Sequence, residues 1–195
     1  MRTHATRHIR LLTATLAALV LVGCLGGGNT RHFQLDMAPA SAPPESVNIV
    51  VDRLTAADPL VPSEIMIQAS PTEIRYHSDA LWAASISELA REKLAAEFGP
   101  HAPERPTILV TGRIRNLGRL EENGNAFAHV RLDLALRHEG MGRYAEPLHR
   151  KTYEARRPLS SDAPDELVLE LSRGIETLAE QIIEDAAQLP LDMAS

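Results

Sequence analysis

The sequence has almost no cysteine: Cys24 is the only one in 195 residues. A single cysteine cannot form a disulfide within the chain, and it cannot supply the paired thiols of a zinc cluster or a CxxC redox motif. The fold must therefore be stable without a covalent cross-link.

Long hydrophobic segments are also scarce. The longest apolar-to-neutral run extends from Leu11 to Val22, and a membrane-spanning helix needs about 20 residues. A short basic segment precedes the run, and the small residue Gly23 follows it. This order is typical of a cleaved export signal, so we expect residues 1–23 to be a signal peptide. Its basic residues are Arg2, Arg7 and Arg10.

The chain lacks an excess of positive charge. Its 20 Lys and Arg residues against 26 Asp and Glu residues give a net charge of −6. Loss of residues 1–23, with three arginines and no acidic residue, would leave 172 residues with a net charge of −9. A nucleic-acid-binding protein would usually be basic. The remaining length suits one domain, and the 44% hydrophobic content can supply a core.

Motifs for catalysis or metal binding are missing as well. The sequence contains neither HExxH nor GxSxG, and its eight histidines are scattered. His129 and His138 would face opposite sides of one strand because their spacing is odd. Gly26-Gly27-Gly28 has no strand before it and no lysine after it, unlike a phosphate-binding loop. We therefore expect no enzyme, no metal and no cofactor.

The patterns that are present predict one α+β domain over residues 46–190. Period-two alternation predicts a largely antiparallel sheet, with a polar last strand near its edge. Apolar residues in steps of three and four predict two long amphipathic helices packed on this sheet. Trp82 falls on the first stripe and is expected in the core, whereas Lys93 lies off it. Asp162 is expected to cap the second helix. The predicted strands are 47–54, 64–69, 73–76, 107–117, 126–138 and 148–156, and the predicted helices are 79–98 and 164–189.

Residues 24–45 are predicted to form a flexible tether, because they are rich in glycine, proline, alanine and serine. One stretch inside it, residues 32–35, has apolar residues at period two. A short edge strand is the alternative interpretation there.

Polar side chains should gather on the outward face of the two longest strands. They are Arg113, Arg115, His129, Arg131, Asp133 and Arg137. This set could bind an acidic partner or a lipid headgroup, and Arg113, Arg131 and Arg137 are the candidate partner-binding residues. The alternative is a solvated face with cross-strand charge pairs.

Leu21-Val22-Gly23-Cys24 resembles the bacterial lipobox. The resemblance implies cleavage before Cys24 and lipidation of that cysteine. Leu25 follows in place of the aspartate that suggests inner-membrane retention, so the outer membrane, facing the periplasm, is expected. An ordinary signal peptide or an uncleaved anchor, with Cys24 incidental, remains the alternative.

The order of these features resembles the ABC-type transport auxiliary lipoprotein family, which includes paraquat-inducible protein C. The resemblance rests on the lipobox, His32-Phe33-Gln34-Leu35, the hairpin before Leu81-Trp82-Ala83, the Asn123-Gly124 turn and the closing amphipathic helix. The sequence departs from the family pattern at two places. His32-Phe33 stands where the family tends to have paired tyrosines, and Ser85 stands near the position after the tryptophan where a proline is common in the family.

The family resemblance implies a non-enzymatic component of an MCE-type ABC lipid transport system. Its partners would be the MCE and ABC transport proteins and outer-membrane lipid, bound through the acyl anchor. The resemblance also allows a homo-oligomer. Nucleic acid is not expected. The alternatives are another outer-membrane assembly lipoprotein, such as the lipopolysaccharide-assembly type, or a periplasmic hydrolase.

Overall fold

The computed structural model describes residues 30–40, 42–142 and 145–190. Contacts join the described residues from Arg31 to residue 190 into one unit. The predicted signal peptide and Cys24 lie outside the described residues. Within those residues, no helix has the length and apolar character needed to cross a membrane.

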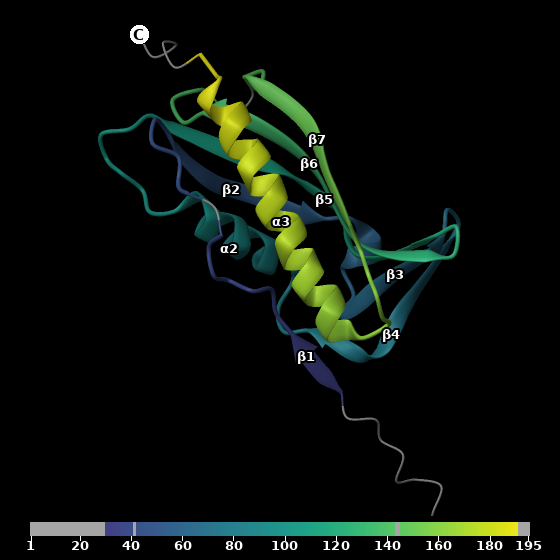
Figure 1. The fold of residues 1–195 in the computed structure, drawn as a ribbon. Coiled ribbons are helices and arrows are strands. Elements are labelled where there is room, and N and C mark those ends of the chain that lie inside the picture. The colour runs from purple at the N-terminus through teal and green to yellow at the C-terminus, as the bar shows by residue number, and fades with distance from the viewer. Residues whose placement is uncertain (1–29, 41, 143–144, 191–195) are drawn as a thin grey trace, which may run out of the picture. The chain divides into compact units, whose positions relative to one another are not determined.

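In the described part of the chain, seven strands form one sheet, and two α-helices lie on one side of it (Figure 1). A short 3₁₀ turn, η2, covers Asp58–Leu60. The strands are β1 Arg31–Phe33, β2 Asn48–Ala56, β3 Glu64–Ser70, β4 Glu73–Trp82, β5 Thr107–Glu122, β6 Asn125–His138 and β7 His149–Pro158, and the helices are α2 Ile86–Phe98 and α3 Pro164–Ala187.

The sheet is mixed, so the prediction of a largely antiparallel sheet was wrong. Strand β5 is long enough to pair with β2 along its first half and with β3 near its end, both in parallel. The β1–β4 pair is also parallel, whereas the β3–β4, β5–β6 and β6–β7 pairs are antiparallel. Alternation in a sequence shows which face of a strand is buried, but it does not show the direction of the neighbouring strand. The prediction of one α+β domain with two helices is consistent with the structure.

Both helices pack their apolar stripes against the inner face of the sheet. α3 contacts β6 and β7, and α2 contacts β2 and α3. Figure 1 shows α3 crossing the sheet in front of β5 to β7. The inward residues of β5 and β6 are fully covered by this layer, including Ile108, Val110, Leu132 and Leu136. We define the opposite side of the sheet as the outer face.

The boundary before α2 differs from the prediction. Residues 79–82 belong to β4, and the helix begins at Ile86. Ser85 caps it, because its side-chain oxygen accepts a hydrogen bond from the amide of Glu88 at 3.3 Å. Ser85 and Glu88 have the spacing of a capping box, and this signal could have placed the helix start correctly. Trp82 is in the core, as expected, but from the end of a strand.

The start of α3 also differs in detail. Ala163 occupies the N-cap without a side-chain hydrogen bond, and Pro164 begins the helix. Proline suits this position because its missing amide hydrogen would have no partner there. Asp162, the predicted cap, pairs instead with Arg119 at 2.6 Å.

The described part of the predicted tether lies against the domain. Arg31–Phe33 forms strand β1, which agrees with the alternative of a short edge strand, and Arg31 pairs with Asp165 of α3. The amide of Asp36 donates to the hydroxyl of Ser172 at 3.0 Å. The backbone of Ala38 and Ala40 is bound by Lys93 and Glu97 of α2. The segment after β1 is therefore held across both helices.

Candidate functional site

The three candidate arginines share the outer face but do not form one cluster. Arg113 is on β5, and Arg131 and Arg137 are on β6. Arg131 and Arg137 are six positions apart, which corresponds to about 20 Å along a strand. They differ in surroundings too, since Arg131 is exposed and Arg137 is partly buried. A single ligand smaller than a protein could not contact all three.

Cross-strand pairs occupy the middle of the outer face. Arg115 donates to one carboxylate oxygen of Asp133, and the Thr152 hydroxyl donates to the other at 2.8 Å. Burial opposes ionisation of Asp133, but these two hydrogen bonds, together with the nearby charges of Arg115 and Arg131, outweigh it and lower the pKa of the carboxyl group. This part of the outer face therefore carries cross-strand charge pairs, as the alternative of a solvated face predicts.

His129 forms a second cross-strand pair. Its Nε2 lies 3.0 Å from a carboxylate oxygen of Glu154, and only 5% of the residue is exposed. Arg156 donates to the same carboxylate at 2.8 Å. Burial lowers the pKa of His129 below its usual value, although Glu154 acts in the opposite direction. His129 is therefore a buried, neutral member of this face at neutral pH.

We expect this histidine to make stability depend on pH. The unfolded chain binds a proton near the usual histidine pKa of about 6.5, but folded His129 resists protonation. The contribution of His129 to the free energy of unfolding is therefore fully present above about pH 6.5. It is lost as the pH falls toward the lower pKa of the folded state. His129→Gln should reduce the loss of unfolding free energy between about pH 7.5 and about pH 5.5, measured by urea denaturation.

His77 serves as the comparison, because burial lowers its pKa as well. His77→Gln should remove a separate part of the loss of unfolding free energy at low pH. The double variant His77→Gln/His129→Gln should show the smallest change of unfolding free energy with pH. If the stability of His129→Gln declined with falling pH as much as that of the unaltered protein, buried His129 would not be a cause of the pH dependence.

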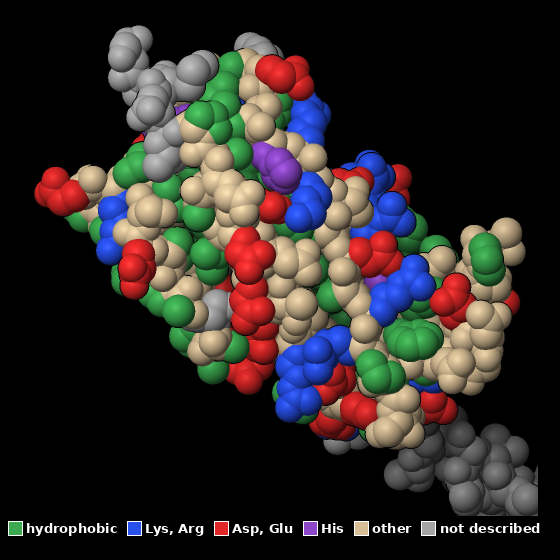
Figure 2. All heavy atoms as spheres, turned by 45° about the horizontal axis from the view of Figure 1, so that its top comes forward, with side chains coloured by type: hydrophobic (Ala, Val, Ile, Leu, Met, Phe, Trp, Pro, Cys, Tyr) green, Lys and Arg blue, Asp and Glu red, His purple; other side chains and the backbone are tan. Residues whose placement is uncertain are grey.

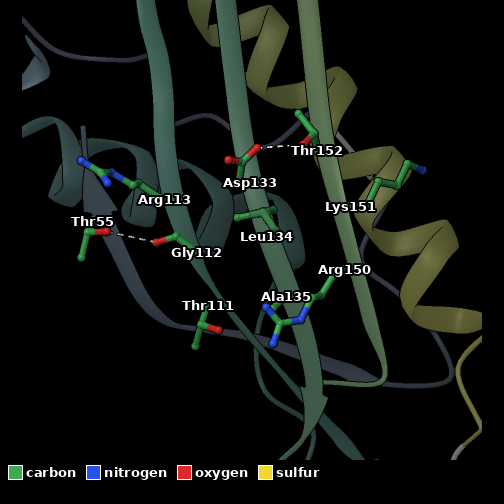
Figure 3. A pocket seen from close by; sticks show the side chains of 10 residues that line it. All are labelled: Thr55, Thr111, Gly112, Arg113, Asp133, Leu134, Ala135, Arg150, Lys151 and Thr152. Atoms are coloured by element: carbon green, nitrogen blue, oxygen red, sulfur yellow. Dashed lines mark hydrogen bonds between the residues drawn. The ribbon is translucent and has the colours of Figure 1, made fainter. Parts of the chain in front are cut away.

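A hollow of about 540 Å³ lies on the outer face beside Asp133 (Figure 3). We call it the outer hollow. Its floor is made by Thr111 and Ala135, which lie opposite each other in the β5–β6 pairing. Figure 3 shows Arg150 of β7 reaching across Ala135, and Arg113 turned toward β2 beside Thr55. The sequence had not singled out Arg150, because only the strand register brings it to this place.

Gly112 allows the strands to approach closely at the outer hollow. A Cβ atom at this position would lie 2.1 Å from the carbonyl oxygen of Asp133, which is backbone and cannot move aside. Any other residue would separate β5 from β6 here. The close pairing of β5 and β6 beside the hollow therefore depends on a glycine.

A second hollow, of about 460 Å³, lies at the ends of the two hairpins. We call it the hairpin hollow. It is lined by Arg131 and Arg156 from the sheet, and by Gln68 and Asn123 near the hairpin ends. Arg156 pairs with Glu154 and Glu122. Arg131 forms no ion pair or side-chain hydrogen bond with the described residues, so its charge is available to a partner.

Acidic and basic side chains lie side by side on the helix side of the molecule (Figure 2). Figure 2 shows a line of acidic side chains on the side in view, with basic side chains beside it. On α3, Glu170 pairs with both Arg157 and Arg173.

Across the described ranges, no group of three or more His, Cys, Asp or Glu side chains could hold a metal ion.

Solved structures share this fold. Protein XCC0632 from Xanthomonas campestris, of the family DUF330, superposes with a TM-score of 0.64 at 16% identity, covering 82% of this chain and 98% of that chain. An uncharacterized protein superposes with a TM-score of 0.60 at 17% identity, covering 81% and 99% of the two chains. At such low identity the similarity concerns the fold alone.

No match was found among curated proteins. The sequence model of one family, described as the ABC-type transport auxiliary lipoprotein component, matches residues 33–183. The match extends from β1 to the last turns of α3, so it covers almost the whole domain. The chain therefore belongs to the ABC-type transport auxiliary lipoprotein family.

Proposed function

We propose that this protein is a non-enzymatic docking component of an MCE-type ABC lipid transport system. It is anchored in the outer membrane through lipidated Cys24 and faces the periplasm. The observation that carries the proposal is the family match over residues 33–183, combined with the lipobox at residues 21–24. The same match favours this role over a lipopolysaccharide-assembly lipoprotein.

The anchor has to provide the membrane affinity. Each buried CH₂ group contributes about 0.8 kcal/mol, and one acyl chain gives only marginal binding, whereas several chains on one cysteine suffice. The acidic net charge offers no attraction to anionic lipid. Cys24 is therefore the residue on which localisation depends.

Cys24→Ser should abolish processing and outer-membrane localisation. Serine lacks the thiol that accepts the first lipid, so the expected product is an uncleaved precursor or a protein found elsewhere. Membrane fractionation with immunoblotting measures both mass and location. Leu25→Ala is the matched control and should be processed normally. A processed Cys24→Ser protein in the outer membrane would contradict the lipoprotein assignment.

The hairpin hollow is the best place on the outer face for a partner's acidic side chain. Most neighbouring charges already have partners: Arg156 pairs with Glu122, and Arg75 pairs with Glu121. Arg131 forms no ion pair with the described residues, and it lines a recess of about 460 Å³. A guanidinium group binds a carboxylate through two parallel hydrogen bonds. We therefore assign the partner contact to Arg131 first.

Arg131→Glu should weaken binding of the transport subunit at least tenfold, because it replaces attraction by repulsion at the contact. The melting temperature should hardly change, since surface substitutions usually stay within about 0.5 kcal/mol. Pull-down and biolayer interferometry at low and high salt measure this, and binding by the unaltered protein should weaken as salt screens the contact. Arg91→Glu, on the exposed side of α2, is the control. Equal binding by both variants would exclude Arg131 from the interface.

Strand β7 is the second candidate surface for association. Among the described strands it pairs only with β6, so its other edge can accept a strand from another chain. A second copy or a transport subunit could use this edge. Light scattering on the full chain in detergent, with and without the subunit, distinguishes the two.

A further inference from the structure

We propose that the outer hollow is a binding site for a phosphoryl group. This site is separate from the hairpin hollow, and the proposal does not depend on the transport role. Its elements are a floor of small residues, two arginines on opposite sides and a threonine hydroxyl available for bonding.

The floor is set by the strand register. Thr111 of β5 lies opposite Ala135 of β6, and Ala135 lies opposite Arg150 of β7. Arg113 follows Thr111 on the same face, two residues further along β5. Small side chains at the centre leave a recess, and the longer side chains around them form its walls (Figure 3).

The two arginines flank the floor on opposite sides and are only weakly engaged. Arg150 lies over the floor, whereas Arg113 is turned toward β2 and would have to swing back over Thr111 to bind a ligand there (Figure 3). β6 lies between their strands, so their Cα atoms are roughly 12 Å apart, which two extended arginine side chains can bridge. Arg113 pairs with Asp58 at 3.1 Å, and the Asp58 side chain is 98% exposed. Arg150 lies 3.6 Å from Glu146, which is 87% exposed. Ion pairs this exposed contribute little, so an anion in the hollow can replace both carboxylates.

Donors around the floor favour phosphate over carboxylate. Nearby Asp133 shows what satisfies a carboxylate on this face, namely one guanidinium group and one threonine hydroxyl. The outer hollow offers two guanidinium groups and the Thr111 hydroxyl, which has no hydrogen-bond partner in the described structure. A phosphoryl group presents more acceptor oxygens than a carboxylate and matches this larger donor set.

Charge and size agree with this assignment. Asp133 is the acidic side chain that lines the hollow, and its pair with Arg115 balances its charge. The volume of about 540 Å³ falls within the usual range for small-ligand sites. A phosphate ester would therefore fit as well as free phosphate.

The test uses the full chain in detergent and phosphate-free buffer. Inorganic phosphate and glycerophosphoethanolamine are titrated separately while the amide resonances of Thr111 and Ala135 are followed by NMR. We expect saturable shifts with at least one probe, and about tenfold weaker binding in Arg113→Gln and in Arg150→Gln. Arg91→Gln should bind as the unaltered protein does. The melting temperature of each variant checks that the fold is intact.

The outcomes separate the sources of the ligand. Tighter binding of inorganic phosphate indicates free phosphate, and tighter binding of the phosphodiester indicates a lipid headgroup; either result supports the site. Saturation by neither probe overturns the proposal, as does full binding by the double variant Arg113→Gln/Arg150→Gln. Acetate binding as tight as phosphate would also overturn it, because the hollow would then be a carboxylate site for a protein partner.

Discussion

Lys93→Met is expected to destabilise the domain by about 3–5 kcal/mol, since removing one partner of a buried ion pair leaves uncompensated charge. The Lys93 side chain is fully buried between α2, α3 and the segment after β1. Its Nζ donates to Glu97 at 2.7 Å, to Glu176 at 2.8 Å and to the carbonyl oxygen of Ala38 at 2.8 Å. Methionine fills a similar volume but leaves two carboxylates facing each other without the cation.

The protonation state of Lys93 supports this expectation. Burial disfavours the charged amine, but the hydrogen bonds that Lys93 donates to Glu176 and Glu97, together with their negative charges, outweigh burial and raise the pKa of Lys93. The lysine is therefore charged in the folded protein. Glu97 also accepts the amide of Ala40 at 3.0 Å. The same substitution should therefore loosen residues 36–40 on the helices.

Urea unfolding measures the global effect, and hydrogen exchange at the amide of Ala40 measures the local one. Arg91→Met, two residues earlier on α2, is the control and should change stability by no more than about 0.5 kcal/mol. Lys93→Met/Glu97→Gln should recover part of the loss, because one of the two facing charges is gone. A cost below about 1 kcal/mol for Lys93→Met would show that the cluster does not stabilise the fold.

The burial of Lys93 also shows where sequence patterns stop being informative. Lys93 and Glu97 have the i, i+4 spacing of an exposed helix pair, and Lys93 lies off the apolar stripe of α2. It is buried because α3 and the segment after β1 cover that side of the helix. Those neighbours are 83 and 55 residues away in the sequence, so no local pattern reveals them.

The strands of the outer face show what the pattern does predict. Alternation in β5 and β6 separated the buried side from the polar side correctly, because a strand has a fixed period of two. The same alternation could not show that β2 and β3 run parallel to β5, since strand direction depends on the connections. It also could not assemble the outer hollow, because Arg150 reaches the floor from β7 through pairing alone. Single faces were therefore predictable, and sites shared by several strands were not.

Trp82→Ala is expected to cost about 3–5 kcal/mol, the usual range for deleting a large aromatic side chain from a core. Trp82 is 3% exposed at the end of β4, opposite Phe33 of β1. Its amide donates to the carbonyl oxygen of Ser63 at 2.7 Å, which holds the connection before β3. The ring thus fills the junction where β1, β4 and the start of α2 meet.

Trp82→Phe separates ring packing from polar contacts. The indole nitrogen is buried without a hydrogen-bond partner among the described residues, so replacing it with a smaller ring loses volume but no hydrogen bond. Phenylalanine should therefore cost clearly less than alanine. Circular dichroism during urea unfolding is the suitable measurement, because the variants lack the only tryptophan.

Val61→Ala is the matched control for the tryptophan variants, since Val61 is 73% exposed in the nearby connection. It should stay within about 0.5 kcal/mol of the unaltered protein. Loss of the Trp82 ring should also weaken protection of the β1 amides, because Phe33 packs opposite it. A cost below about 1 kcal/mol for Trp82→Ala would place the ring outside the core and would make it a candidate for ligand binding.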